Sequence, residues 1–183
     1  AATPGTLVPA AMKVLVPDDA TVFAMTSPLS ELERVAASIA EDVNPEMAGM
    51  MSVDMLLQVA MPPGFDGSAI DRSRPVGMAV GPISMAAEPQ IYALIPTSNP
   101  EAIKAALPGG TERYATRVSD GYIGVTMGLE YGNSTGISTL LQNMPAGLIA
   151  VNVDMETMLT DFRPMIDFGL QMARMELDSA MDE

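Results

Sequence analysis

The sequence predicts an α+β protein whose antiparallel sheet carries helices packed on one face. Short apolar runs follow one another along the chain with turn residues between them, which argues against a parallel sheet. Two of these runs flank Asp120-Gly121, a typical hairpin turn. Three amphipathic stretches begin directly after a capping residue, as helices do.

The first third of the chain predicts a leader, a strand and two helices. Residues 1–13 are expected to form a flexible leader, because Thr, Pro, Gly and Ala predominate there. The apolar run at 21–26 follows turn residues and predicts a strand. Ser27-Pro28, a cap followed by proline, starts a helix that is expected to end before Asn44. Residues 52–61 predict a further helix.

The middle of the chain is predicted to be rich in strands. Apolar runs at 75–80 and 90–95 are expected to pair as antiparallel neighbours. Residues 99–108 begin with an asparagine cap followed by proline and predict a helix. The runs at 113–118 and 122–127 are the two strands of the expected hairpin.

The last part of the chain predicts a helix, a strand and a second helix. Residues 133–143 are expected to be helical, and 148–153 to form a strand. Asp154 then caps a long final helix, in which Pro164 is expected to introduce a kink.

An arrangement of elements occurs twice, at a spacing of about 127 residues. Residues 15–26 and 143–153 both contain a proline, turn residues and a short apolar strand, and both lead into a capped amphipathic helix. We interpret 14–142 as a first α+β module. Residues 143–183 are then the strand and helix that start a second module, or a C-terminal helix packing on the first. On this interpretation the chain belongs to a longer polypeptide.

Three short motifs carry a resemblance to known families. They are Leu15-Val16-Pro17-Asp18-Asp19, Ile70-Asp71-Arg72-Ser73-Arg74-Pro75-Val76, and Leu94-Ile95-Pro96 ahead of Asn99-Pro100. Over about residues 14–160 the chain resembles uncharacterised exported bacterial α+β repeat-module proteins of the planctomycete and myxobacterial type, a domain of unknown function. The resemblance implies an extracytoplasmic bacterial protein and carries over no catalytic residue.

Composition excludes several kinds of chemistry. The 183 residues include no Cys and no His, which excludes a His-dependent triad, a thiolate nucleophile and a conventional zinc or iron–sulfur site within the chain. The net charge of −14 repels phosphate backbones and argues against nucleic-acid binding. The longest uncharged stretch, 132–153, contains Asn, Gln, Ser and Pro, so no transmembrane segment is expected.

Methionine is unusually frequent, at 17 residues, and it gathers at 47–55 and along the final helix. Helical spacing favours core packing of these thioethers. A pliable partner surface and a Cu(I) site are the alternatives, although Cys and His ligands for a metal are missing. We therefore expect no cofactor and no metal.

Charged groups offer little chemistry. Acidic side chains outnumber basic ones in the final helix, which a solvated helix face explains, with a cation site or a catalytic pair as alternatives. Arg72 and Arg74 could grip a carboxylate or phosphate, but pairing with local acids is favoured. The glycines between 121 and 136 match no phosphate-binding loop and suit turns and close packing.

We interpret the sequence as a non-enzymatic extracytoplasmic binding or assembly domain, and no catalytic, cofactor-binding or metal-binding residue is assigned. Its partners are the remainder of its own polypeptide, other subunits, or further copies of the chain. A hydrolase or carbohydrate-active enzyme using paired carboxylates is one alternative, and a binder of an apolar small molecule or soft metal is another. The final helix is expected to make the main contact, unless it folds back on its own sheet. Its candidate partner-binding residues are Met155, Met158, Leu159, Phe162, Met165, Ile166 and Phe168.

Overall fold

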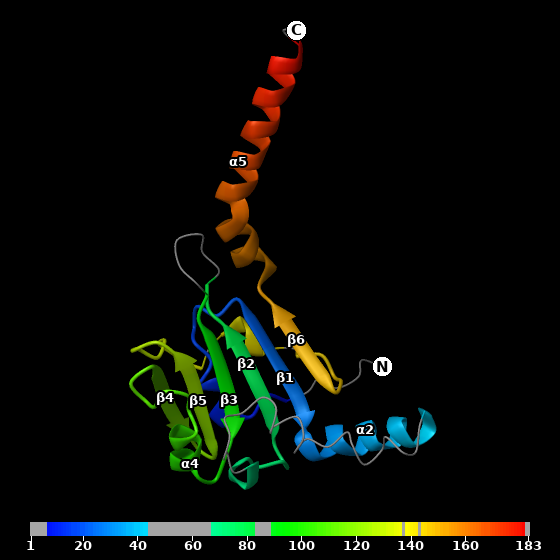
Figure 1. The fold of residues 1–183 in the computed structure, drawn as a ribbon, viewed down its shortest axis with the longest axis vertical. Helices are drawn as coiled ribbons and strands as arrows, with labels where there is room; N and C mark the ends of the chain where they lie inside the picture. Colours follow the sequence, from blue (N-terminus) through cyan, green and yellow to red (C-terminus); the bar gives the residue numbers. More distant parts are fainter. Residues whose placement is uncertain (1–6, 44–66, 83–88, 137, 143, 182–183) are drawn as a thin grey trace.

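The computed structural model describes residues 7–43, 67–82, 89–136, 138–142 and 144–181 (Figure 1). Six strands form one sheet in the order β4-β5-β3-β2-β1-β6, and every neighbouring pair is antiparallel. The α+β class with an antiparallel sheet is confirmed. The elements are α1 (Ala10–Lys13), β1 (Val22–Pro28), α2 (Leu29–Val43), β2 (Pro75–Val80), β3 (Ile91–Pro96), α4 (Pro100–Ala105), β4 (Tyr114–Ser119), β5 (Tyr122–Met127), β6 (Ile149–Val153) and α5 (Met155–Met181).

The predicted strands of the middle region lie within one residue of the observed ones. β2 and β3 pair as antiparallel neighbours, with Gly77 opposite Leu94. The hairpin of β4 and β5 closes between Ser119 and Tyr122, and Gly121 adopts a φ of 76°, a left-handed conformation that favours glycine. Asn99 caps α4, because its Oδ1 accepts a hydrogen bond from the Ala102 N–H at 3.2 Å.

β1, the first strand in sequence, lies between β2 and the last strand, β6. Val22 stands opposite Val153 and Thr26 opposite Ile149. The expected cap at Ser27 is wrong, because the strand continues to Pro28 before α2 begins. Both polar groups of Ser27 bond to the segment ahead of β6: its N–H donates to the Leu148 carbonyl at 2.7 Å, and its hydroxyl donates to the Gly147 carbonyl at 3.2 Å.

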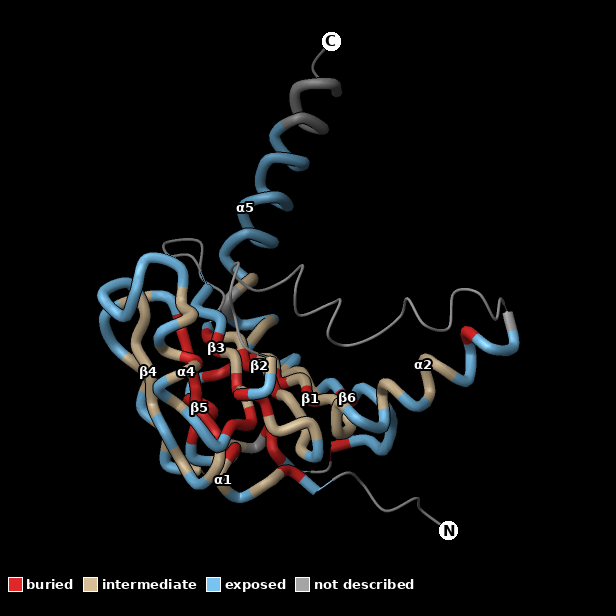
Figure 2. The backbone as a smooth tube through the Cα atoms, turned by 60° about the horizontal axis from the view of Figure 1, so that its bottom comes forward, coloured by how far each residue is buried: buried red, intermediate tan, exposed pale blue. Residues whose placement is uncertain are grey.

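The main core covers one face of the sheet, which we call the closed face (Figure 2). Its floor consists of alternate strand residues, among them Phe23, Met25, Tyr92 and Leu94, all buried. Residues from α1 and the turn after it, and from the segment 131–144, lie over this floor. They are Met12, Leu15, Val16, Tyr131, Leu140, Leu141 and Met144.

The leader expected over residues 1–13 is therefore too long. Val8 and Met12 belong to the core, and the Met12 side chain has no exposed surface. The Met12 sulfur lies so close to Gly77 that a methyl group there would be 2.9 Å from it. The composition of residues 1–13 did not predict this core contact, because Met12 is the one large apolar side chain in the short helix α1.

The helix expected over 133–143 is also wrong: within its described part, only Thr139–Leu141 forms a single 3-10 turn. Bonds to the N-terminal region hold this segment in an irregular path. The Thr135 N–H donates to Asp18 Oδ1 at 2.9 Å, and the Tyr131 hydroxyl donates to the Leu15 carbonyl at 2.7 Å. Gly136, with a φ of 76°, sits in the left-handed region. Tertiary bonds override local propensity here.

On the opposite face, which we call the open face, the described residues form a second, smaller cluster over β3, β5 and the start of β4. There α4 and the turn Gly67–Ala69 pack Ile103 and Ile70 against Ile123 and Val125. Toward β1 and β6 the described residues leave strand side chains exposed. The predicted helix at 52–61 and the methionine cluster at 47–55 lie outside the described residues. Across the described chain, none of the helices combines the length and the apolar character that a bilayer crossing requires.

β6 and α5 repeat the order strand then helix seen in β1 and α2. The two strands are direct antiparallel neighbours, and their helices leave from opposite ends of the sheet (Figure 1). Their sheet neighbours differ, because β1 has a strand on each side, whereas β6 has only β1 beside it among the strands that the structure describes. The duplication of a module stays a prediction. β6 joins the same sheet as β1 to β5.

Candidate interaction surface

The final helix projects away from the sheet (Figure 1). Asp154 caps it as expected: the Thr157 N–H donates to Asp154 Oδ1 at 3.0 Å, and the Thr157 hydroxyl donates to Oδ2 at 2.9 Å. These bonds, with the backbone one first, hold the pKa of the Asp154 carboxyl below its usual value. α5 then continues through Pro164 to Met181 without a break.

The apolar residues predicted to bind a partner lie along this projecting helix. Phe168 is 63% exposed and Ile166 is 49% exposed. Met155, Leu159 and Met165 are also exposed, whereas Met158 and Phe162 are half-buried. The helix does not fold back on the sheet in this structure. The same strip continues through residues that the sequence interpretation did not nominate, namely Leu170, Met172 and Met175.

Methionine therefore has two different roles. Met12, Met25 and Met144 fill the closed-face core, as the sequence favoured. The described methionines of α5 do not pack in any core, and Met172 and Met175 are exposed well beyond the sheet. For this helix the expectation of core packing is wrong.

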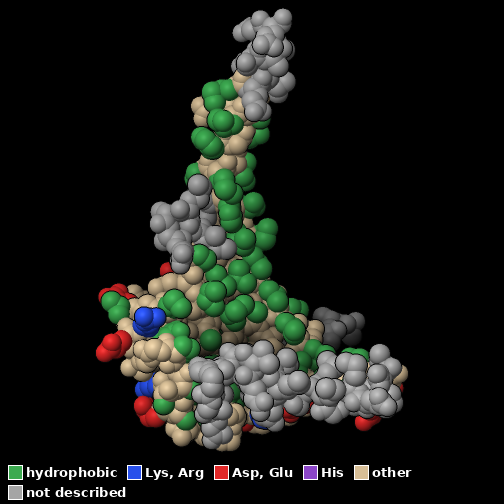
Figure 3. Space-filling view, viewed as in Figure 1, with side chains coloured by type: hydrophobic (Ala, Val, Ile, Leu, Met, Phe, Trp, Pro, Cys, Tyr) green, Lys and Arg blue, Asp and Glu red, His purple; other side chains and the backbone are tan. Residues whose placement is uncertain are grey.

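The open face adds a second apolar area next to the base of α5. Its strand residues form rows across the sheet, because directly opposed residues share a face. One row contains Val153, Val22 and Val80, and the next contains Val151, Ala24 and Met78. Ile91 at 55% exposure and Val151 at 50% show how far these rows remain uncovered. Figure 3 shows hydrophobic side chains gathered over this part of the sheet and continuing up α5.

The outer edge of β6 is a third feature of this surface. The Ser27 N–H bonds to the Leu148 carbonyl, and the Asp154 N–H bonds to the Thr21 carbonyl at 2.8 Å. Bonded pairs alternate in an antiparallel ladder, so Ala150 and Asn152 also face β1. The N–H and C=O groups of Ile149, Val151 and Val153 therefore point outward. Within the described chain, nothing bonds to them.

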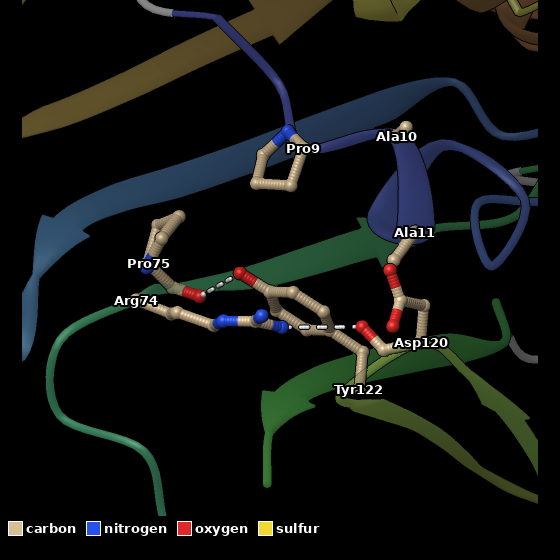
Figure 4. Close-up of a pocket in the computed structure, with 7 residues that line it drawn as sticks. All are labelled: Pro9, Ala10, Ala11, Arg74, Pro75, Asp120 and Tyr122. Atoms are coloured by element: carbon tan, nitrogen blue, oxygen red, sulfur yellow. Dashed lines mark hydrogen bonds between the residues drawn. The ribbon is translucent and has the colours of Figure 1, made fainter.

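A shallow pocket of about 270 Å³ lies elsewhere, where the N-terminal segment meets the start of β2 (Figure 4). The Arg74 guanidinium stacks on the Tyr122 ring at 5.6 Å and donates to the Asp120 carbonyl at 3.1 Å. The Tyr122 hydroxyl donates to the Pro75 carbonyl at 3.2 Å, and burial raises its pKa to about 12. The Arg74 and Tyr122 side chains are therefore held by bonds to backbone carbonyls of the pocket wall.

Both arginines of the Asp71–Pro75 motif pair with acids, as expected. Arg72 lies 3.0 Å from Glu33 of α2, and Arg74 lies 3.4 Å from Asp71. The Ser73 hydroxyl donates to Asp71 Oδ1 at 2.6 Å. This bond is the main reason why the pKa of Asp71 is lowered, with smaller contributions from the Ser73 N–H and Arg74. The motif ties α2 to the start of β2.

The carboxylates give no sign of acid–base chemistry in the described residues. A general acid needs a raised pKa, but the two carboxyls with a resolved shift, Asp71 and Asp154, both have lowered values. The described residues also contain no group of three or more acidic side chains suited to a metal ion.

Comparison with protein-family models, with curated proteins and with solved structures finds no match to this chain. The candidate surface therefore rests on its own geometry.

Sequence reasoning found the apolar strip of α5 but missed the open face and the outer edge of β6. One signal was present. β1 and β6 carry apolar residues at both alternating positions, as in Val22-Phe23-Ala24-Met25 and Ile149-Ala150-Val151. A strand with one face in water normally alternates apolar and polar residues. Apolar residues at both alternating positions therefore predict that neither face of these strands is fully open to water.

Proposed function

We propose that this chain is a non-enzymatic, extracytoplasmic binding or assembly domain that works as part of a larger polypeptide or complex. The apolar strip of α5 makes its main contact. The observation that carries this proposal is the exposure of this strip on a helix that projects from the sheet. The strip comprises Met155, Met158, Leu159, Phe162, Met165, Ile166 and Phe168.

The physical argument is the cost of leaving such a helix alone in water. Most of the stability of a protein helix comes from packing its apolar face, since propensity alone leaves isolated helices marginal. α5 contains Gly169 and Pro164 in its interior, and both residues weaken a helix. A partner that covers the strip would supply the missing stabilisation. Exposed contiguous apolar surface typically marks such a contact.

The composition of the strip suits an adaptable contact. Methionine is unbranched and polarizable, and it packs against partners of different shape. Phe162 and Phe168 provide the large buried areas on which interfaces depend. The extracytoplasmic location is supported by the resemblance to exported bacterial families, and fractionation of cells that express the tagged protein tests it.

Charge placed on the strip tests the proposed contact. The variant Phe162→Asp with Ile166→Asp should lose the association made by α5, measured as a lower sedimenting mass, while the melting curve of the monomer barely moves. A matched control is Thr160→Asp with Gln171→Asp, which adds the same charge on the side of the helix away from Phe162 and Ile166 and should leave association intact. If the strip instead belonged to a core, each change would cost about 3 kcal/mol or more. Unfolding of the isolated monomer would therefore refute the proposal.

A further inference from the structure

We propose that β6 pairs with β6 of a second copy of this chain, antiparallel and about a two-fold axis at Val151, so that two sheets become one. This inference rests on the assembly role proposed above, and it adds the partner and the geometry of one contact. Three observations on β6 carry it: its outward backbone groups, its side chains, and the register in which two copies meet.

The outward backbone groups of β6 can be satisfied by another strand. Ile149, Val151 and Val153 direct their N–H and C=O groups away from β1, as the bonds at Leu148 and Asp154 establish. An antiparallel strand that meets these groups continues the ladder without moving β1. The edge of a sheet is a template for this kind of pairing.

The register in which two copies meet is self-complementary. A two-fold axis at Val151 places Val151 opposite Val151 of the second copy, and Ile149 opposite Val153 of the second copy. β-branched residues directly opposed across strands stabilise a sheet. Asp154, the first acid after the strand, falls opposite Leu148 of the second copy, so no like charges are opposed. The strong negative charge of the chain therefore stays outside the contact.

β6 also lacks the devices that keep sheet edges apart. Charged side chains, proline and bulges normally protect an edge strand. β6 contains none of these, and Ile149 and Val151 expose 65% and 50% of their surface. The opposite edge strand, β4, carries Arg117, and in Figure 3 charged side chains gather on that side of the sheet.

The proposed pairing would also unite the two open faces. A two-fold axis perpendicular to the sheet keeps both open faces on the same side. The row through Val151, Ala24 and Met78 would then run without interruption into the same row of the second copy. The two α5 helices would leave from opposite ends of the joined sheet, because their strands are antiparallel.

Single-cysteine variants test this geometry, since the chain has no cysteine of its own. The test position is Val151→Cys, and the control is Val118→Cys on β4, because Val118 lies on the same face with 49% exposure. In the proposed pair the two Cα atoms at position 151 lie about 5.5 Å apart, within reach of a short bismaleimide. Crosslinking at 151 should be at least about tenfold faster than at 118, since pairing raises the local thiol concentration from micromolar toward millimolar. Equal rates would overturn the proposal.

A second pair of variants removes one outward backbone N–H from each edge strand, at a residue whose side chain makes no hydrogen bond to the described residues. Val151→Pro removes an outward N–H from β6, and Thr116→Pro removes one from β4. The Thr116 N–H points outward, because the Gly128 N–H bonds to the Arg113 carbonyl and bonded pairs alternate along the strand. Edge strands tolerate proline at such positions. The first variant should sediment with a lower mass than the unmodified chain, because the edge contact is lost, and the second should sediment like the unmodified chain. Unchanged sedimentation of Val151→Pro would refute the edge pairing.

The outcomes separate the two proposals. If the α5 aspartate variant loses association and Val151→Cys crosslinks no faster than its control, the helix contact stands and the strand pairing fails. If crosslinking at Val151 is fast and the α5 aspartates leave the sedimenting mass unchanged, the strand pairing stands and the α5 contact fails.

Discussion

The closed and open faces of the sheet come from the same strands, yet their surroundings are opposite. In β3 the Leu94 side chain is fully buried on the closed face, whereas Ile91, three residues earlier, is 55% exposed on the open face. On the closed face, large covering side chains such as Met12 pack over small strand residues such as Gly77. A hydrogen bond from Thr135 to Asp18 holds part of the covering segment in place. Toward β6, the described residues leave apolar side chains of the open face exposed. The first face therefore holds the fold, and the second is available for contacts.

The largest difference in stability between the two faces is expected between the variants Leu94→Ala and Ile91→Ala. Removing the buried Leu94 side chain should lower the free energy of unfolding by about 3 kcal/mol, because it leaves a cavity in the closed face. The loss at Ile91 should stay below about 1 kcal/mol in the isolated monomer, since water already reaches that side chain. Urea unfolding of both variants measures the difference. Similar losses at the two positions would contradict the division into two faces.

The same substitution at two glycines should have opposite effects. A methyl group at Gly124 would collide with the Tyr131 hydroxyl, which is fixed by its bond to Leu15, so Gly124→Ala should cost about 2 kcal/mol. At Gly169 in α5 an added methyl group meets nothing within 4 Å, and Gly169→Ala should stabilise the helix by up to about 1 kcal/mol. Thermal unfolding followed at 222 nm reports both effects. A neutral Gly124→Ala would show that the closed face is loosely packed.

The smallest expected effect concerns alkaline pH. Burial raises the pKa of the closed-face tyrosines Tyr92, Tyr122 and Tyr131, and that of Tyr122 reaches about 12. Their neutral forms contribute stability that is complete below pH 10, the unfolded value, and that is lost as the pH rises from 10 toward 12. Each such group changes the unfolding free energy by at most about 1.4 kcal/mol per pH unit in this window.

Tyr122→Phe removes one of these groups and should make the fall above pH 10 shallower. At neutral pH it should cost about 1 kcal/mol, because the bond to the Pro75 carbonyl is lost. Urea unfolding at pH 8 and at pH 10.5 measures both quantities. An unchanged slope would indicate that Tyr122 is accessible to water.

The strands could be predicted because their determinants are local. The β4–β5 hairpin depends on Gly121, and the cap of α4 depends on Asn99, both of which stand beside the elements they define. The segment 133–143 could not be predicted in this way. Its path depends on Asp18 and Leu15, which are more than a hundred residues away, and no local signal reveals those bonds.

The interaction surface was predictable in its helical part only. Helical periodicity placed Phe162 and Ile166 on one side of α5, but periodicity does not say whether that side is covered. The outward edge of β6 depends on which strand pairs with β1. The pairing of β1 with β6 brings together Thr26 and Ile149, which lie far apart in the sequence. The sequence of neither strand indicates which strand it pairs with.

The position of β1 between β2 and β6 has a consequence for synthesis of the protein on the ribosome. At rates of about 5–20 residues per second, the chain between β1 and β6 takes roughly ten seconds to emerge. During this time β1 is itself an unpaired edge, and its sequence Val22-Phe23-Ala24-Met25 contains no charge. Contacts between residues so far apart also slow folding, because the loop between them must close first. The sheet is therefore completed last beside β1, the earliest of its six strands, and this edge of β1 is open to mispairing until β6 has emerged.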